Sequence, residues 1–398
     1  MSPPEIRYDL QIRFGSEYGP EEERALIDVL RQGAPTSGTA CERFEQEFAA
    51  YCGTRYARVA TNGTAALFLS LLAAGVGHGD RVVTTPLTWI ATAAAAATLG
   101  AEIDFVDIDP GTYNMDPEKL RDKVANTKAV IPVHLYGQCC DMDPILSLAQ
   151  KHGFHIIEDA CHAVGARYKG RLAGSLGTAG CFSFHEQKNM STLGEGGMVV
   201  TNRPEIYERF SLYRSHCTRV YGKSTKYCQM DESRHPMGKR FWFQDFDDVG
   251  YNFRMTDIQA AVGRIQLRKL DGFNEIRAKN ARYLMDALRD VPGLTLPKTL
   301  PGNTHVFHLF PVLIDPEGYG INRDDFVYAM LHKRGIKVGT HYSPIHLSQA
   351  FQKRGFRKGQ FPIAEYISER LVTLPLNPRQ TPEALEYLVD SIRALPGL

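Results

Sequence analysis

A chain of 398 residues is too long to fold around one compact core, so we expect two domains. Its composition, 43% hydrophobic and 23% charged, is typical of a soluble globular protein. A formal net charge of +1 gives no overall field that would attract nucleic acid or an anionic membrane surface. We therefore expect neither nucleic acid nor a membrane among its partners.

The sequence predicts a cytoplasmic protein without a metal centre. The first residues, MSPPEIRYDLQIRF, have no apolar signal-peptide core, and no stretch reaches the roughly 18 apolar residues of a membrane span. The eight cysteines form neither a CxxC pair nor a disulfide framework. We therefore expect free thiols in a reducing compartment and no zinc site.

Two helices are predicted near the N-terminus, on either side of a turn rich in hydroxyl groups at residues 34–38. The first is amphipathic, follows an approach segment within residues 13–31 and stops at Gly33, and the second covers residues 42–52.

Residues 56–70 then predict an apolar strand, the turn Thr61-Asn62-Gly63-Thr64 and an apolar helix. In this arrangement backbone N–H groups and the helix dipole point at an anion, as in a phosphate site. The alternative is that Thr61 or Asn62 only caps the helix.

Strand and helix patterns alternate from there to residue 158. Such alternation predicts a largely parallel sheet covered by helices on both faces, with ligands beyond the carboxyl ends of its strands. Polar or aromatic candidates follow strand ends at residues 61–64, Trp89, Asp159 and Ser183. The predicted strands cover residues 80–85, 102–106, 129–134 and 155–158, and the predicted helices cover residues 89–99, 117–124 and 142–152.

Asp159 ends one of these apolar strands and has no basic residue nearby in the sequence. The simpler interpretation is that its carboxylate caps a helix. A carboxylate at this place can also keep the ring nitrogen of a heteroaromatic cofactor protonated, as enzymes that use pyridoxal 5′-phosphate (PLP) require.

Lys188 lies between an apolar run that ends at Phe184 and the glycine-rich turn 194–197, after which residues 198–201 predict a returning strand. A lysine held between two such elements is shielded from water, which lowers its pKa from about 10.4 and makes its amine able to form a Schiff base. The alternative is a solvated loop lysine beside a glycine hairpin.

Residues 209–248 form an irregular insert rich in Arg, Lys, His and aromatic residues. One interpretation is a surface excursion. The other is a loop that enters a neighbouring active site and binds a phosphorylated, nucleotide-linked or polyol substrate.

The second half begins with a long predicted helix over residues 252–288, with a capping box formed by Thr256 and Gln259. We place the domain change within this helix, with a large domain of residues 1–260 and a small domain of residues 261–398. The small domain is predicted to contain strands at residues 304–314 and 336–339 and helices at residues 323–334 and 382–395.

Six ordered motifs resemble the PLP-dependent sugar aminotransferases of the DegT/DnrJ/EryC1/StrS family. The resemblance runs from about Gly33 to the C-terminus, and six motifs in one order make it specific. The motifs are ATNGTAALFLSL, PLTWIATAAA, VHLYGQCCDMD, IIEDACHAVGARYKG, FSFHEQKNMSTLGEGG and GYNFRMTDIQAAVGRIQLRKL.

The resemblance implies catalytic roles around PLP. Lys188 is similar to the lysine that forms the Schiff base, Asp159 to the carboxylate that pairs with the pyridinium nitrogen, and Trp89 to the aromatic residue that stacks on the ring. One branch of the family has histidine at the lysine position and performs dehydration or deoxygenation. Because this chain has lysine there, the resemblance favours transamination.

The resemblance also implies cofactor and substrate contacts. Gly63 and Thr64 would donate N–H groups to the phosphate and Ser183 a hydroxyl, His162 would lie near the ring, and Asn252 would reach the phosphate of a neighbouring subunit. The last contact implies a homodimer with shared active sites. The candidates for substrate contacts are His185, Arg254, His341 and Tyr342, where a structural role for His341 is the alternative.

The implied fold class is α/β, of the aspartate-aminotransferase type (fold type I). A mostly parallel seven-stranded sheet flanked by helices forms the large domain, and the smaller C-terminal domain is α+β. The implied activity transfers an amino group from glutamate or glutamine to a keto sugar, linked to a nucleotide diphosphate, by a ping-pong mechanism. The alternatives are a keto-cyclitol of the inosose type as acceptor, and a PLP-binding regulatory relative without turnover.

Overall fold

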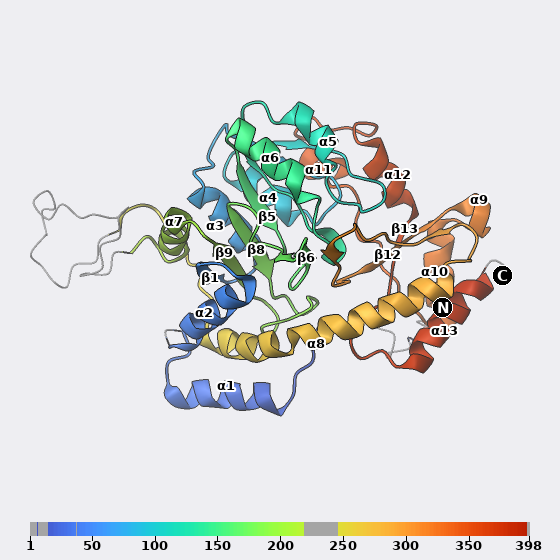
Figure 1. Ribbon diagram of the computed structural model, residues 1–398, viewed down its shortest axis with the longest axis horizontal. Coiled ribbons are helices and arrows are strands. Elements are labelled where there is room, and N and C mark those ends of the chain that lie inside the picture. Colours follow the sequence, from blue (N-terminus) through green and yellow to red (C-terminus); the bar gives the residue numbers. More distant parts are fainter. Residues whose placement is uncertain (1–5, 7–14, 37, 219–245, 396–398) are drawn as a thin grey trace, which may run out of the picture.

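A seven-stranded sheet forms the centre of the computed structural model, which describes residues 6, 15–36, 38–218 and 246–395 (Figure 1). Strand β9 runs antiparallel to both of its neighbours, and the other six strands share one direction. The predicted, mostly parallel sheet is confirmed. In spatial order the strands are β1 (Tyr56–Ala60), β9 (Gly197–Thr201), β8 (Ala179–Ser183), β5 (His155–Asp159), β4 (Thr127–Val130), β2 (Arg81–Thr84) and β3 (Glu102–Phe105).

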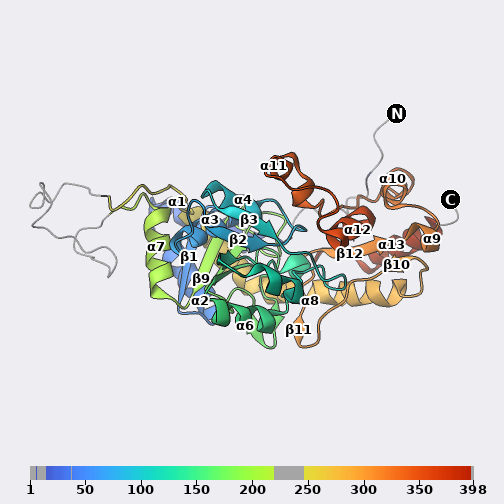
Figure 2. The same cartoon turned by 90° about the horizontal axis from the view of Figure 1, so that it is seen from above.

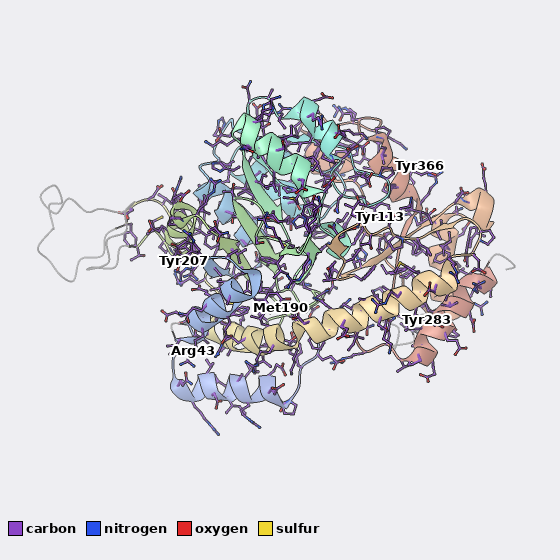
Figure 3. All side chains as sticks on the ribbon, in the orientation of Figure 1. Arg43, Tyr113, Met190, Tyr207, Tyr283 and Tyr366 are labelled. Atoms are coloured by element: carbon purple, nitrogen blue, oxygen red, sulfur yellow. The ribbon has the colours of Figure 1, made fainter. Side chains whose placement is uncertain are left out.

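Helices cover both faces of the sheet because successive strand residues point to opposite sides. Ile157 packs among residues of α3 (Gly63–Ala73), α4 (Ala91–Thr98) and α7 (Pro204–Arg214). Its neighbour Ile156 packs on the other face, in a core that includes Met190, labelled in Figure 3. That second face is covered by α2 (Ala40–Cys52), α6 (Met142–His152) and the first half of α8 (Asp257–Leu288).

Helix α8 extends from the sheet to the smaller C-terminal part, as both views show (Figures 1 and 2). It begins with the predicted capping box, in which the Thr256 hydroxyl accepts from the N–H of Gln259. Leu270 still packs in the core of the sheet, whereas Ala281 packs in the core of the C-terminal part. The core contacts of α8 therefore change between Leu270 and Ala281. The division into residues 1–260 and 261–398 remains a prediction.

The C-terminal part contains a three-stranded antiparallel sheet with helices packed against it. The sheet has the order β10 (Leu294–Thr295), β12 (Phe310–Ile314) and β13 (Leu371–Leu374). Its helices are α9 (Pro316–Tyr319), α10 (Arg323–Arg334), the 3₁₀ turn η4 (Ile345–Leu347), α11 (Gln349–Gln352), α12 (Pro362–Arg370) and α13 (Pro382–Ala394). The remaining elements are α1 (Pro20–Gln32), α5 (Pro117–Leu120), η2 (Arg121–Lys123), η3 (Leu135–Gly137), β6 (Arg167–Tyr168), β7 (Arg171–Leu172) and β11 (Asn303–Thr304).

Several predicted elements differ from the structure. Residues 304–314 do not form one strand, because the His305 ring accepts the N–H of Phe307 at 2.9 Å and Phe307 has a positive φ of 45°. Residues 336–339 contribute one bridge, between Gly339 and Thr373, rather than a strand. The predicted helix 117–124 is divided into α5 and η2.

The predicted insert also begins too early. Residues 209–214 belong to helix α7, and residues 219–245, which carry most of the insert, lie outside the described residues. Within the described ranges, no helix is long and apolar enough to cross a membrane.

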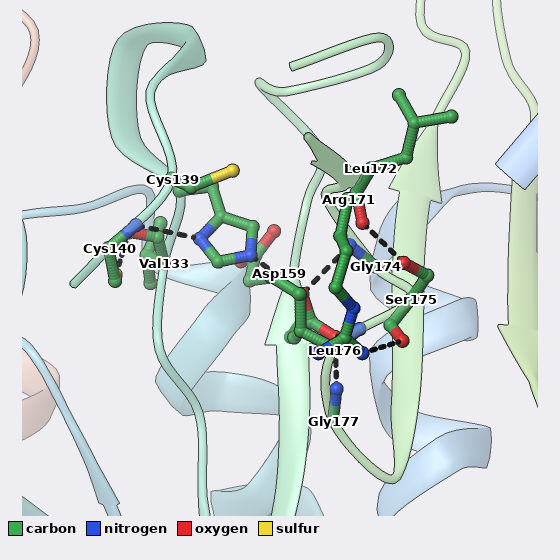
Figure 4. Close-up of polar contacts among 12 residues, drawn as sticks. Val133, Cys139, Cys140, Asp159, Arg171, Leu172, Gly174, Ser175, Leu176 and Gly177 are labelled. Carbon is green, nitrogen blue, oxygen red and sulfur yellow. Dashed lines mark hydrogen bonds and ion pairs between the residues drawn. The ribbon is translucent and has the colours of Figure 1, made fainter. Parts of the chain in front are cut away.

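Glu158, which precedes Asp159 in β5, fastens the loop around residues 172–177 to the sheet. Its carboxylate accepts the N–H groups of Gly174 at 2.8 Å, Leu176 at 2.7 Å and Gly177 at 2.5 Å (Figure 4). His134 Nδ1 accepts the N–H of Cys140, so its Nε2–H donates to Glu158 at 2.9 Å. These four hydrogen bonds fix the end of β5, where Asp159 is the last residue.

Candidate active site

A cavity of about 600 Å³ opens beyond the carboxyl ends of the parallel strands, a usual size for a small-molecule site. Its walls come from the turn after β1, the segments that follow β2, β4, β5 and β8, and two segments of the C-terminal part. The predicted site residues that line it are Gly63, Thr64, Trp89, Asp159, His162, Ser183, His185, Lys188, His341 and Tyr342.

Lys188 is half-buried in the loop between β8 and β9 and lines the cavity. The backbone fixes this loop, since the N–H of Lys188 donates to the carbonyl of His185 and the N–H of Gly15 donates to that of Glu186. Burial lowers the pKa of Lys188, and the nearby Cys161, Asp159 and Glu195 only partly offset this. A larger share of this amine is therefore uncharged and nucleophilic than for a solvated lysine.

Asp159 is 5% exposed and is held by two hydrogen bonds. The Thr92 hydroxyl donates to Oδ2 at 2.7 Å, and the N–H of Cys161 donates to Oδ1 at 3.2 Å. No helix begins after Asp159, so the capping alternative is not what the structure shows. The carboxylate lies in the same cavity as Lys188, where it can meet a protonated ring nitrogen.

The turn between β1 and α3 combines the two alternatives considered for it. Asn62 caps the helix by accepting the N–H of Ala65 at 2.8 Å. The N–H groups of Gly63 and Thr64 belong to the first helical turn, which has no intrahelical partner for them. A Cβ on Gly63 would lie 2.8 Å from that of Ser183, so glycine permits the close approach of these two elements.

Histidines form the inner wall of the cavity. The rings of His162 and His308 lie 4.3 Å apart, and Tyr342 Oη lies 3.3 Å from His162 Nε2. Burial lowers the pKa of both histidines well below the usual range, so both are neutral. His162 Nδ1 is buried without a hydrogen-bond partner among the described residues and thus remains available to a bound ligand.

Two predicted residues lie elsewhere. Asn252 and Arg254 are exposed outside the cavity, near Ser215: Asn252 forms a bridge with it, and Arg254 Nη1 donates to its hydroxyl at 2.9 Å. Trp89 lies in the cavity wall but is 60% exposed, with its ring centroid 6.0 Å from that of Tyr342.

Sequence reasoning did not identify several residues that line the cavity, among them Thr92, His308 and Lys337. His308 and Lys337 fall in segments that were predicted as strands, so nothing marked them as site residues. Thr92 falls in a predicted helix, where nothing marked it as a site residue, and its hydroxyl lies 3.3 Å from that of Thr88.

The donors of this cavity fit PLP. An amine of lowered pKa, a buried carboxylate, two free N–H groups at a helix start and an unpartnered imidazole nitrogen match its aldehyde, ring nitrogen, phosphate and ring oxygen.

Comparisons with known proteins agree with this fit. Residues 17–393 match the model of the DegT/DnrJ/EryC1/StrS aminotransferase family. The chain is 36% identical to dTDP-3-amino-3,4,6-trideoxy-alpha-D-glucose transaminase of Streptomyces venezuelae, over 97% of this chain and 94% of the relative. It also resembles a crystal structure of S. venezuelae DesV in complex with a ketimine intermediate, with a TM-score of 0.84, 35% identity and 95% of each chain covered.

A third likeness concerns the cofactor. The PLP-form of Spr1654 from Streptococcus pneumoniae superposes with a TM-score of 0.85 at 25% identity, over 100% of this chain and 98% of that one. The predicted family, fold, enzyme class and cofactor are all confirmed. The chain belongs to the DegT/DnrJ/EryC1/StrS aminotransferase family and is a PLP-dependent sugar aminotransferase.

Proposed function

We propose that this enzyme moves the amino group of glutamate or glutamine to the keto group of a nucleotide-diphosphate-linked sugar. The observation that carries the proposal is the placement of Lys188 and Asp159 in one cavity at the carboxyl edge of the sheet. The name of the S. venezuelae transaminase, which contains a dTDP-linked sugar, supports this choice of acceptor.

Different residues of the cavity would hold the cofactor and move protons. When bound, PLP supplies an aldehyde and an electron-withdrawing ring that carry the amino group from donor to acceptor. Lys188 would hold the aldehyde and, once displaced by the donor, its uncharged amine can take the proton from the donor's α-carbon. Asp159, fixed by Thr92, would keep the ring nitrogen protonated.

The other residues would orient the ligands. Gly63 and Thr64 would receive the phosphate at the start of α3, with the Ser183 hydroxyl beside them. His162 and Trp89 would contact the ring. His185, His341 and Tyr342 line the rest of the cavity, and we propose them as substrate contacts. Arg254 has no such support, because it lies outside the cavity and bonds to Ser215.

We also propose a homodimer with shared active sites. Asn252 is exposed and lies outside the cavity of its own chain, which supports a role toward the phosphate of a partner subunit. Asn252→Ala should then weaken PLP retention while the protein remains a dimer by light scattering. An unchanged PLP affinity in a confirmed dimer would contradict this role.

The test of the reaction uses the absorbance of the bound cofactor. Purified holoenzyme is mixed with L-glutamate or L-glutamine, freed of donor, and then given a panel of nucleotide-linked keto sugars and inososes. We expect one donor to bleach the visible band and one nucleotide-linked keto sugar to restore it. Recovery with an inosose alone would replace the proposed acceptor by a cyclitol, and a band that no donor bleaches would refute the proposed donors.

A further inference from the structure

Lys337 is an exposed cation on the wall of the cavity. None of the carboxylates that the structure describes lies within ion-pair distance of its amine. Two carboxylates line the cavity. Asp159 accepts hydrogen bonds from Thr92 and Cys161, and the Glu195 carboxylate lies 4.0 Å from His185 Nε2. Lys337 therefore has a charge that a ligand can use.

The backbone on both sides of Lys337 is fixed. Ile336 is fully buried, and its N–H donates to the carbonyl of Met330 at 2.8 Å. Gly339 exchanges two hydrogen bonds with Thr373, at 3.0 and 2.8 Å. The fold thus sets where the side chain of Lys337 starts, and only the side chain has to become ordered when it meets a ligand.

The place of Lys337 indicates which part of a substrate it meets. The α-carboxylate of an amino-acid donor is attached to the reacting carbon, so it must lie close to Lys188. The diphosphate of a nucleotide-linked sugar is separated from the keto carbon by the sugar ring, so it can reach an exposed residue at the wall. The exposure of Lys337 favours the second group.

The chemistry of lysine points the same way. A lysine ammonium is a point charge that binds phosphate groups in many proteins. No arginine occurs among the described residues that line the cavity. A free cyclitol has no charge and would leave Lys337 without a counter-ion.

We propose that Lys337 binds the phosphate groups of the acceptor and so selects nucleotide-diphosphate-linked keto sugars over uncharged cyclitols. This inference rests on the proposed function and adds the residue that sets the class of acceptor.

The test compares Lys337→Gln with Lys337→Arg, in holoenzyme. The two half-reactions are measured separately by the absorbance of the cofactor. Lys337→Gln should raise the KM for the nucleotide-linked keto sugar about 5- to 10-fold and weaken its dependence on salt, with kcat and the donor half-reaction within about twofold of wild type. Lys337→Arg should recover most of the KM. Lys333→Gln, an exposed lysine of α10 outside the cavity, should behave as wild type.

A direct binding measurement tests the role of Lys337 separately from the proposed acceptor. Calorimetry should show that dTDP or UDP alone binds wild-type holoenzyme and binds Lys337→Gln about 5- to 10-fold more weakly. If wild type aminates a nucleotide-linked keto sugar but Lys337→Gln keeps its KM and its dTDP affinity, the role of Lys337 is refuted while the proposed function stands. A change confined to the donor half-reaction would also refute it. Wild type that aminates only inososes would refute the proposed acceptor itself.

Discussion

The Thr92 hydroxyl donates a 2.7 Å hydrogen bond to Oδ2 of Asp159, which lies 67 residues later in the sequence. Both residues line the cavity beyond the carboxyl ends of the strands. Both side chains are buried, so loss of this bond leaves a buried carboxylate oxygen without one of its donors. We expect Thr92→Val, which keeps the side-chain shape, to slow the donor half-reaction about tenfold, because a hydrogen bond to a charged group contributes about 1.5 kcal/mol or more. Stopped-flow bleaching of the cofactor band with donor measures this.

The same helix supplies a matched control. Thr98 lies at the end of α4, is exposed and donates to the carbonyl of Ala94. Thr98→Val should leave the half-reaction unchanged. Equal rates in Thr92→Val and wild type would show that Thr92 does not support Asp159.

Glu158 should be necessary for stability rather than for chemistry. Its buried carboxylate accepts four hydrogen bonds and donates none. In Glu158→Gln an NH₂ group would face N–H donors, so we expect a loss of about 2–4 kcal/mol in the free energy of unfolding. Urea denaturation measures it. The exposed Glu118→Gln is the control, and a Glu158→Gln variant as stable as Glu118→Gln would contradict the prediction.

The sequence predicted those parts of the site that follow strand ends. Alternating strand and helix patterns gave the parallel sheet, and with it the shared edge where Asp159 and Ser183 meet the turn before α3. Lys188 was marked by its position between an apolar run and a glycine-rich turn, and the motif resemblance added His162 and Tyr342. Both routes rely on order along the chain.

Contacts between segments that are distant in the sequence could not be predicted from its patterns. His308 lies in a segment with the composition of a strand, and only the turn formed by the His305 side chain ends the strand pattern and places His308 beside His162. The bond from Thr92 to Asp159 depends on how α4 packs over the sheet. Composition and periodicity predict neither the geometry of the bond between Thr92 and Asp159 nor the exposure of Lys337.

The buried His305 predicts a specific pH dependence of stability. Burial lowers the pKa of His305 to about 3, and its Nδ1 accepts the N–H of Phe307. The unfolded chain takes up a proton at this histidine below about pH 6.5, while the folded chain does not until about pH 3. The unfolded state then holds more protons, so this histidine lowers stability as pH falls, by about 1.4 kcal/mol per pH unit well below pH 6.5.

His305→Asn should remove this contribution, because an asparagine oxygen can accept the same N–H and does not titrate. Urea unfolding at pH 7, 6 and 5 should show a shallower acid loss in His305→Asn than in wild type. The exposed His78→Asn should keep the wild-type slope. Parallel slopes for wild type and His305→Asn would mean that His305 is protonated alike in both states.

Lys188→Ala tests the proposed covalent and proton-moving role. We expect turnover to fall at least about a hundredfold, the usual range for the loss of a general base, while PLP still binds through the turn before α3 and Asp159. Rapid-quench assays measure the rate, and absorbance after gel filtration measures the retained cofactor. Lys151→Ala, an exposed lysine of α6, is the control. Wild-type transamination by Lys188→Ala would overturn the assignment.

A chain of buried amides fixes the ring of His308. The amide nitrogen of Asn274 donates to the carbonyl of Val164, and that of Asn189 donates to Asn274 Oδ1 at 2.8 Å and to the carbonyl of Val306 at 3.1 Å. Asn189 Oδ1 is therefore an acceptor, and it lies 3.1 Å from His308 Nδ1. His308, which lines the cavity, must therefore carry its proton on Nδ1 and keep the lone pair on Nε2.

We expect Asn189→Ala to release this tautomer and to slow both half-reactions about tenfold, because the ring beside His162 loses its fixed orientation. Stopped-flow absorbance measures the rates, and NMR of protein with ¹⁵N-labelled histidine reports the protonated nitrogen of His308, a signal that a general loss of stability would not change selectively. Asn202→Ala is the matched control, since its exposed amide oxygen accepts the N–H of Arg55. If Asn189→Ala kept the Nδ1–H signal and the wild-type rates, Asn189 would be only a packing residue.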